Sequence, residues 1–262
     1  MQFLKPALKP TMLATALGAC ALSFPTLAQE QHTDAVQQLV DRGVTVTQSF
    51  DAPGGMTGYV GEMQGRPIAF YLTPDKENVI VGTMINADGE NLTEPKVQKL
   101  VQGPKNEKAW GQLEQADWVR DGDANAPVII YTFTDPNCPY CHRFRQAAEP
   151  WISAGKVQLR HVMVGILRQD SLPKAATILG SDNPRDALNE NQQNHDNGGI
   201  SVDRAIVSAN AKRVRKNNQL MSSLGLSATP STYYRDGDGN IQMKQGAARP
   251  GEMELIMGSP KP

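Results

Sequence analysis

A pair of cysteines between a predicted strand and a predicted helix limits the folds that this chain can adopt. Residues 127–133 form a nearly continuous apolar, β-prone run, as expected of a strand buried on both faces of a sheet. After a short turn, Cys138 and Cys141 open residues 138–154, a segment whose apolar side chains recur at helical spacing. A buried strand that leads directly into a helix predicts an α/β domain with both cysteines at the junction.

This position gives the two cysteines different chemistry. At a helix N-terminus, Cys138 faces unpaired backbone N–H groups and the positive end of the helix dipole, which both favour the thiolate. Its pKa is therefore expected below the value of about 8.5 of a free cysteine. Pro139 suits the first helical turn because it lacks an N–H that would have no partner there. We predict that Cys138 is the exposed nucleophile and that Cys141 is the more buried thiol that resolves a mixed disulfide.

Three other uses of this motif have weaker support in the sequence. Cys138 to His142 also spells C-x-x-C-H, the attachment motif of c-type haem, but a preceding buried strand is atypical of cytochromes. Zinc binding by the three motif side chains and a distant histidine, His161 or His195, lacks a second closely spaced ligand pair. A purely structural disulfide across two residues gains little from loop closure. We therefore expect no cofactor and no metal ion.

The first 28 residues are typical of a secretory signal peptide. Lys5 and Lys9 form a basic region, and an uncharged, mostly apolar run follows over residues 12–24. Small residues then precede a cleavage site after Ala28. The apolar run is too short to span a bilayer. A lipoprotein box ending at Cys20 is the alternative, although the apolar run continues beyond that cysteine.

Export restricts what the remaining chain can do. Cleavage leaves two cysteines in an oxidising compartment, where unpaired thiols are readily captured, and one closely spaced pair is what a redox protein needs.

Charge and composition exclude several other classes of protein. The 262 residues carry 26 Lys and Arg against 27 Asp and Glu, so no basic surplus exists for binding nucleic acid. A hydrophobic content of 39% is enough for a packed core, so a disordered or collagen-like chain is excluded.

Turn and boundary signals divide the mature chain into residues 29–92, 93–120 and 121–262. The first part is about 60 residues long, a marginal size for a lone core, so we expect it to pair with a second copy. Its predicted elements are a helix at 30–42 and strands at 44–47, 58–63, 67–72 and 79–85. The second part predicts two short linker helices that are broken at Gly103-Pro104.

The third part alternates strands and helices around the cysteine pair. Its further predicted elements are strands at 157–164, 231–235 and 241–245, a helical stretch at 171–224 with three breaks, and a last helix at 251–257. Thr229-Pro230 lies directly before one of these strands. A proline there often marks a cis peptide bond in a tight turn, although an ordinary trans proline is equally compatible with the sequence.

These motifs resemble the DsbC/DsbG family of periplasmic thiol:disulfide interchange proteins over nearly the whole mature chain. The most specific matching segments are residues 49–56, 71–75, 89–92, 135–141, 155–160 and 256–258. The resemblance implies an α+β chain in three parts. These are a small N-terminal cystatin-like dimerisation domain (29–92), a helical linker (93–120) and a C-terminal thioredoxin-like α/β domain with a helical insertion (121–262).

The resemblance also implies the function. Cys138 and Cys141 match the redox-active pair, and Thr229 and Pro230 match the substrate-binding loop with its cis-proline. The implied protein is a periplasmic homodimer, kept reduced by a membrane thiol reductase of the DsbD type. Its clients are folded proteins with exposed single cysteines, whose sulfenic acids it reduces. Disulfide isomerisation, chaperone activity and disulfide donation remain alternatives.

One departure from thioredoxin itself is informative. Thioredoxin carries a buried carboxylate six residues before its first motif cysteine, and here that position is Thr132. Without this base to take the proton from Cys141, we hypothesise that Cys141 attacks a mixed disulfide comparatively slowly.

Overall fold

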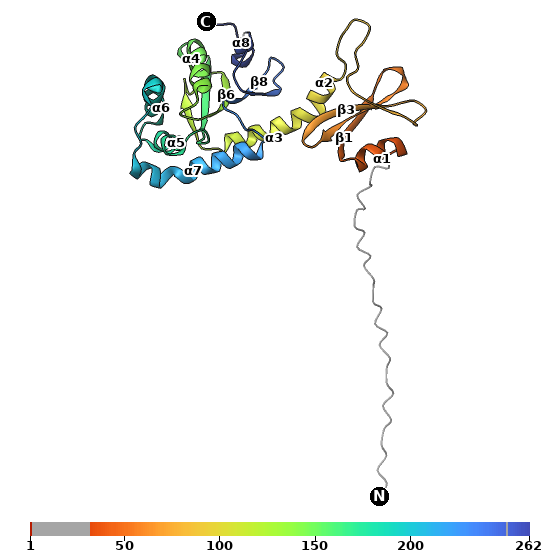
Figure 1. The fold of residues 1–262 in the computed structure, drawn as a ribbon, viewed down its shortest axis with the longest axis horizontal. Coiled ribbons are helices and arrows are strands. Elements are labelled where there is room, and N and C mark those ends of the chain that lie inside the picture. Colours follow the sequence, from red (N-terminus) through yellow and green to blue (C-terminus); the bar gives the residue numbers. More distant parts are fainter. Residues whose placement is uncertain (2–31, 250) are drawn as a thin grey trace.

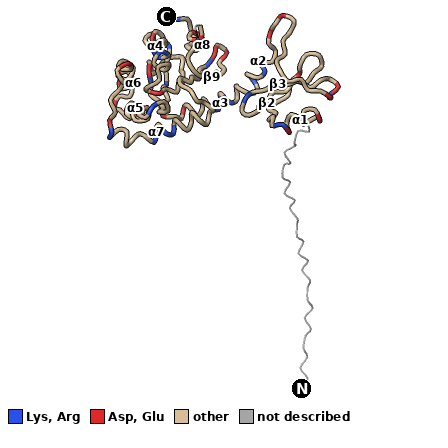
Figure 2. The backbone as a smooth tube through the Cα atoms, in the orientation of Figure 1, with Lys and Arg blue, Asp and Glu red and all other residues tan. Residues whose placement is uncertain are grey.

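The computed structural model describes Met1, residues 32–249 and residues 251–262. Apart from Met1, the predicted signal peptide lies outside the described residues, and so does Cys20. Two lobes are joined by a helical connection (Figure 1). Within the described ranges, no helix is both long and apolar enough to cross a membrane. Figure 2 shows Lys and Arg interspersed with Asp and Glu over both lobes.

The N-terminal lobe is one helix packed on an antiparallel sheet with strand order β1-β2-β3-β4. Helix α1 spans Asp34–Asp41, and the strands are β1 (Val44–Asp51), β2 (Thr57–Met63), β3 (Arg66–Leu72) and β4 (Val79–Val81), with a 3₁₀ turn at Pro53–Gly55. Val36 from the helix packs with Val44, Phe70 and Leu72 from the sheet. Phe70 and Leu72 stand two positions apart on β3 and therefore lie on the same face of the sheet, which packs against α1.

One predicted strand of this lobe is shorter than expected. The apolar run at 79–85 predicts a single strand, but β4 ends at Val81. Gly82 then has φ +150°, a backbone conformation that residues other than glycine rarely adopt. Beyond it, Ile85 forms an isolated bridge to Asn91. The glycine thus ends the strand within a sequence whose apolar character continues.

The connection between the lobes is continuous helix, so the predicted break at Gly103-Pro104 is wrong. It comprises α2 (Glu94–Val97), a π-helical segment (Gln98–Gln102) and α3 (Gly103–Glu114). In the π segment, the N–H of Gly103 donates to the carbonyl of Gln98, five residues back. A wider π turn leaves room for the ring of Pro104, which in a regular α-helix clashes with the carbonyl four residues earlier.

The C-terminal lobe is built on a five-stranded sheet with order β5-β7-β6-β8-β9. The strands are β5 (Trp118–Asp121), β6 (Val128–Thr134), β7 (Val157–Met163), β8 (Ser231–Arg235) and β9 (Ile241–Gln245). Only β6 and β7 pair in parallel, and the other pairs are antiparallel. Strand β5 was not predicted, since four residues that include Arg120 and Asp121 carry too little apolar pattern.

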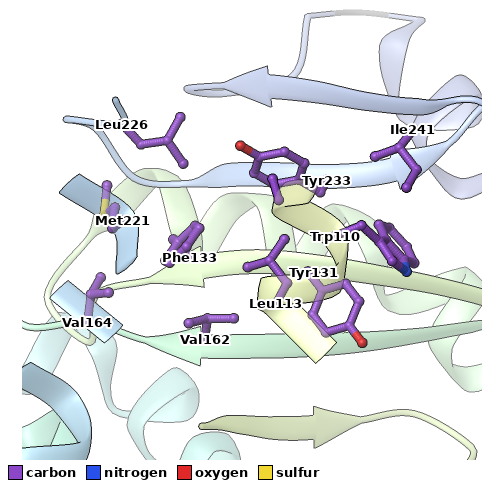
Figure 3. Close-up of a cluster of buried hydrophobic side chains, with 11 residues drawn as sticks. Trp110, Leu113, Tyr131, Phe133, Val162, Val164, Met221, Leu226, Tyr233 and Ile241 are labelled. Carbon is purple, nitrogen blue, oxygen red and sulfur yellow. The ribbon is translucent and has the colours of Figure 1, made fainter. Parts of the chain in front are cut away.

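Helices cover both faces of this sheet. They are α4 (Pro139–Ser153), α5 (Ser171–Gly180), α6 (Pro184–Gln193), α7 (Arg204–Ser223) and α8 (Glu252–Met257), with a 3₁₀ turn at His195–Asn197. Ile130 of β6 packs against α4 and α8, whereas Tyr131 and Phe133 pack against α3 and α7. Figure 3 shows Leu113 and Trp110 of α3 inside this second cluster. The central strand is thus buried on both faces, as its apolar run predicts.

Candidate active site

Cys138 is the N-cap residue of α4, at the point where β6 has ended and the chain turns into the helix. Its backbone is extended (φ −82°, ψ 112°), and its sulfur accepts a hydrogen bond from the N–H of Cys141 at 3.2 Å. Pro139 occupies the first helical position, as predicted. The sulfur therefore satisfies one of the N–H groups that a helix leaves unpaired at its start.

The Thr229-Pro230 loop lies directly against this cysteine. The peptide bond between the two residues is cis. The Cys138 thiol donates to the carbonyl oxygen of Thr229 at 3.3 Å, although 91 positions separate the two residues. Strand β8 starts at the next residue, Ser231, and pairs with Phe133 of β6. The structure thus brings together the four residues that the sequence and the family resemblance single out.

The expectation of an exposed nucleophile is wrong. Cys138 is only 2% exposed and Cys141 3%, and both are free thiols. Thr229 closes the approach to the first sulfur, because its carbonyl sits at hydrogen-bonding distance and its side chain is itself buried. A reaction partner must therefore contact the loops around Cys138 in order to reach its sulfur.

The surroundings move the pKa values of the two thiols in opposite directions. The Cys141 thiol, the Thr229 hydroxyl and the N–H groups of Cys141 and Tyr140 stabilise the Cys138 thiolate, and together they outweigh burial and lower its pKa to about 6. Burial, followed by the neighbouring Cys138 sulfur, raises the pKa of Cys141. Near neutral pH, the pair thus holds one thiolate and one thiol.

The Thr229 hydroxyl is placed to stabilise a thiolate. Its oxygen is buried and has no hydrogen-bond partner. A buried hydroxyl without a partner is costly, and it becomes satisfied when it donates to a thiolate on Cys138. Thr132, the position of thioredoxin's carboxylate, is buried too, but its hydroxyl accepts from Thr232 at 3.3 Å.

Asp135 is a residue of the site that sequence reasoning treated only as part of a turn. It is 1% exposed, and its carbonyl accepts from the N–H of Cys138 at 3.0 Å. Its carboxylate is held by hydrogen bonds from neutral groups rather than by a salt bridge. A carboxylate placed directly after a strand buried on both faces is the signal that could have found it, since a buried charge needs dedicated partners.

The histidines have partners that the sequence did not reveal. The Nδ1 of His142 donates to the side-chain oxygen of Gln192 at 2.7 Å, and the His142 ring stacks on that of His195 with ring centroids 4.4 Å apart. His161 is 1% exposed, bonds Thr134 at 2.8 Å and has Nε2 3.8 Å from the Asp121 carboxylate. Among the described residues, no three potential metal ligands form a cluster.

Fold and site together define a thiol–disulfide oxidoreductase built on a thioredoxin-like domain, and comparison with known proteins agrees. Residues 25–94 match the disulfide bond isomerase N-terminal domain, and residues 120–259 match the thioredoxin-like domain. The predicted fold class is therefore confirmed.

Two relatives show the family to which the chain belongs. The chain is 40% identical to the thiol:disulfide interchange protein DsbG of Pseudomonas aeruginosa, an alignment covering 88% of this chain and 90% of the relative. It is 38% identical to DsbG of Escherichia coli K12, with 90% and 96% covered. The chain belongs to the DsbG family of thiol:disulfide interchange proteins.

Proposed function

We propose that this protein reduces sulfenylated single cysteines of folded client proteins in the periplasm. The observation that carries the proposal is the opposite shift of the two thiol pKa values, which gives a thiolate at Cys138 while Cys141 keeps its proton. A thiolate is the species that attacks an oxidised sulfur, and a protonated neighbour stays available for the second step. The signal-peptide pattern supports export.

The proposed reaction has three steps. The Cys138 thiolate attacks the sulfur of the client's sulfenic acid, an S–S bond forms, the S–O bond breaks, and the oxygen leaves as water after taking up a proton. Cys141 then loses its proton and attacks the Cys138 sulfur, so the client leaves as a reduced cysteine and Cys138 and Cys141 form a disulfide. An external dithiol, which we propose is a membrane reductase of the DsbD type, returns two electrons to the pair.

We further propose that the protein works as a homodimer. In the part of the chain that the structure describes, β4 pairs only with β3, so its outer edge is unpaired. Ile80 and Val81 on this edge are 54% and 53% exposed, and Ile85 beside it is 62% exposed. An unpaired apolar edge strand is a ready template for a second copy.

Isomerase and oxidase activities would use the same cysteines and differ in the preferred redox state and client. A holdase chaperone would work without either thiol, so its activity would survive replacement of both by serine. Replacement of both cysteines by serine therefore separates the chaperone from the redox activities, and the redox state of the pair in the cell separates an oxidase from a reductase or isomerase.

The proposed reductase makes a covalent intermediate that a single substitution should trap. In Cys141→Ser, the mixed disulfide between Cys138 and the client cannot be resolved internally, so it should accumulate after incubation with a protein carrying one sulfenic acid. Non-reducing electrophoresis and mass spectrometry would detect it as one client per protomer. Cys138→Ser is the matched control and should trap none. A Cys141→Ser protein that traps no sulfenylated client, while still reacting with small disulfides, would contradict the reductase proposal.

A further inference from the structure

The loop between β7 and α5 exposes two large apolar side chains beside the active-site turn. Ile166 is 42% exposed and Leu167 is 48% exposed. The loop runs alongside the turn that leads to Cys138, since the N–H of Val164 donates to the carbonyl of Thr134 at 2.9 Å. Solvent-exposed apolar side chains next to a buried nucleophile indicate a surface that contacts a reaction partner.

Asp135 clamps this loop to the active-site turn. One oxygen of its buried carboxylate accepts from the backbone N–H of Ile166 at 2.8 Å and from that of Leu167 at 3.0 Å. The carbonyl of the same residue accepts from the N–H of Cys138. One residue therefore fixes both the nucleophile and the two apolar side chains.

The ends of the loop are held as well. The Asn218 carboxamide of α7 makes two hydrogen bonds to the backbone of Gly165, at 3.0 and 3.2 Å. A Cβ at Gly165 would lie 2.3 Å from the Cα of Leu172, so only glycine allows this close approach. The N–H of Arg168 donates to the Ser171 hydroxyl at 3.0 Å. Side chains thus satisfy the backbone N–H groups of four consecutive loop residues.

A second layer of hydrogen bonds ties the clamp to the residue before Cys138. The other oxygen of Asp135 accepts from the Ser171 hydroxyl at 2.8 Å and from the N–H of Asn137 at 2.9 Å. The Asn137 carboxamide in turn donates to Ser171 and Asp170 and accepts from Lys174, each at 2.9 Å. The loop and the cysteine turn therefore form one hydrogen-bonded unit.

We propose that Ile166 and Leu167 are a docking surface for apolar side chains that flank the reacting cysteine of the client, and that Asp135 is the positioning residue of this surface. Because Cys138 is recessed, a client sulfur can approach it only when the neighbouring client residues lie on the surrounding loops. A loop that is already ordered loses little conformational freedom on binding, so contacts with it favour the client. This inference rests on the proposed function and adds a preference among clients.

Peptides that carry one cysteine as a mixed disulfide with thionitrobenzoate test the surface. One peptide has Leu and Phe on either side of the cysteine, and the other has Ser and Gly. Attack by Cys138 on the peptide sulfur releases the coloured thionitrobenzoate thiolate and leaves the peptide attached, in a Cys141→Ser background that prevents resolution. The protein should react faster with the apolar peptide, by about fivefold.

Substitution of the surface should remove this preference. In Ile166→Ser/Leu167→Ser the ratio of the two rates should fall below about twofold, because the apolar contact is lost. Val202→Ser is the matched control, because Val202 is an apolar residue with a similar exposure of 41%. It precedes the first residue of α7, whereas Asn218, which holds the docking loop, lies near the last turn of that helix. It should keep the full ratio. Equal rates with both peptides, or a ratio retained in the double variant, would overturn the surface. Reaction with neither peptide would instead contradict the proposed function.

The clamp has a separate readout. Asp135→Ala removes both acceptor oxygens, so the N–H groups of Ile166 and Leu167 lose their partner. Amide hydrogen exchange at Ile166 and Leu167 should accelerate at least about tenfold, and the preference for the apolar peptide should fall with it. Unchanged exchange, or faster exchange with the full preference retained, would overturn the role of Asp135.

Discussion

Among single residues, the difference in pKa between Cys138 and Cys141 depends on groups that sequence spacing alone does not specify. The N–H groups at the start of α4 follow from the C-x-x-C pattern, but the Thr229 hydroxyl comes from a loop 91 positions away. A charged acceptor gains more from a hydrogen bond than a neutral one. The partnerless hydroxyl of Thr229 therefore favours the thiolate of Cys138 over its thiol.

Removal of this hydroxyl should raise the pKa of Cys138. A hydrogen bond to a charged group contributes about 1.5 kcal/mol, so Thr229→Val should move the pKa of Cys138 upward from about 6 by roughly one unit. Reduced protein then loses thiolate stabilisation at neutral pH, so the Cys138–Cys141 couple should become more reducing by about 20–30 mV. The pH dependence of iodoacetamide alkylation and equilibration with glutathione would measure the two shifts. Thr232→Val, whose hydroxyl contacts Thr132, is the control and should leave the alkylation midpoint unchanged.

The same pKa value sets a pH window for activity and stability. The folded pKa of Cys138 lies below that of an unfolded cysteine, so the thiolate stabilises the reduced protein at pH values above the unfolded pKa. That contribution is lost progressively as the pH falls from about 8.5 through about 6. The alkylation rate of Cys138 should decrease as the pH falls, with a midpoint near pH 6. A midpoint near the pKa of a free cysteine, about 8.5, would contradict the lowered pKa of Cys138.

Among the helices and strands, α3 belongs to the core of the C-terminal lobe rather than serving as a tether. Leu113 is fully buried, Trp110 packs edge-on against Tyr131 with ring centroids 4.9 Å apart, and the Asn106 carboxamide donates to the carbonyl of Ile241 at 2.8 Å. Figure 3 shows this helix against β6. Helix α3 is thus part of the active-site lobe, whereas Val97 and Val101 of the preceding segment pack on the N-terminal sheet.

A core substitution in α3 should therefore destabilise the active-site lobe. Leu113→Ala removes a side chain with no exposed surface, at an expected cost of about 2–5 kcal/mol in the free energy of unfolding. Gln112→Ala, at an exposed neighbouring position, should change it by less than about 0.5 kcal/mol. Denaturant unfolding followed by the reactivity of the two thiols would report on this lobe. An unchanged midpoint for Leu113→Ala would mean that α3 is only a linker.

How far the sequence predicts these elements depends on the range of the interactions involved. Local patterns predicted β8 and β9 at their observed limits and placed Cys138 at the start of α4, since periodicity and turn residues act over a few positions. Strand β5 was missed because it is stabilised from a distance. It pairs with β7, and its buried Asp121 is held by Arg145, 24 positions away. The Asp135 clamp was missed for the same reason, because its partners lie more than 30 positions away.

At the scale of the whole molecule, the two lobes leave different kinds of surface unpaired. Helices cover both faces of the sheet in the C-terminal lobe (Figure 1). The N-terminal lobe instead ends its sheet at β4, where Ile80 and Val81 are exposed. An edge that pairs with the same edge of a second copy gives a closed two-fold dimer. Such a dimer would bury Ile80, Val81 and Ile85 and would carry one active-site lobe on each protomer.

Charges on this edge should separate the dimer without damaging the active site. Ile80→Lys/Val81→Lys places two like charges of each protomer at the proposed two-fold contact, where their desolvation and repulsion oppose pairing. Analytical ultracentrifugation should show a dimer for wild type at micromolar concentration and a monomer for the double variant. Leu255→Lys, at an apolar α8 residue that is 54% exposed, is the matched control and should remain dimeric. The charged variant should keep the wild-type alkylation rate of Cys138, because α3 and the thiols belong to the other lobe. A wild-type monomer, or a double variant that still dimerises, would show that β4 is not the contact.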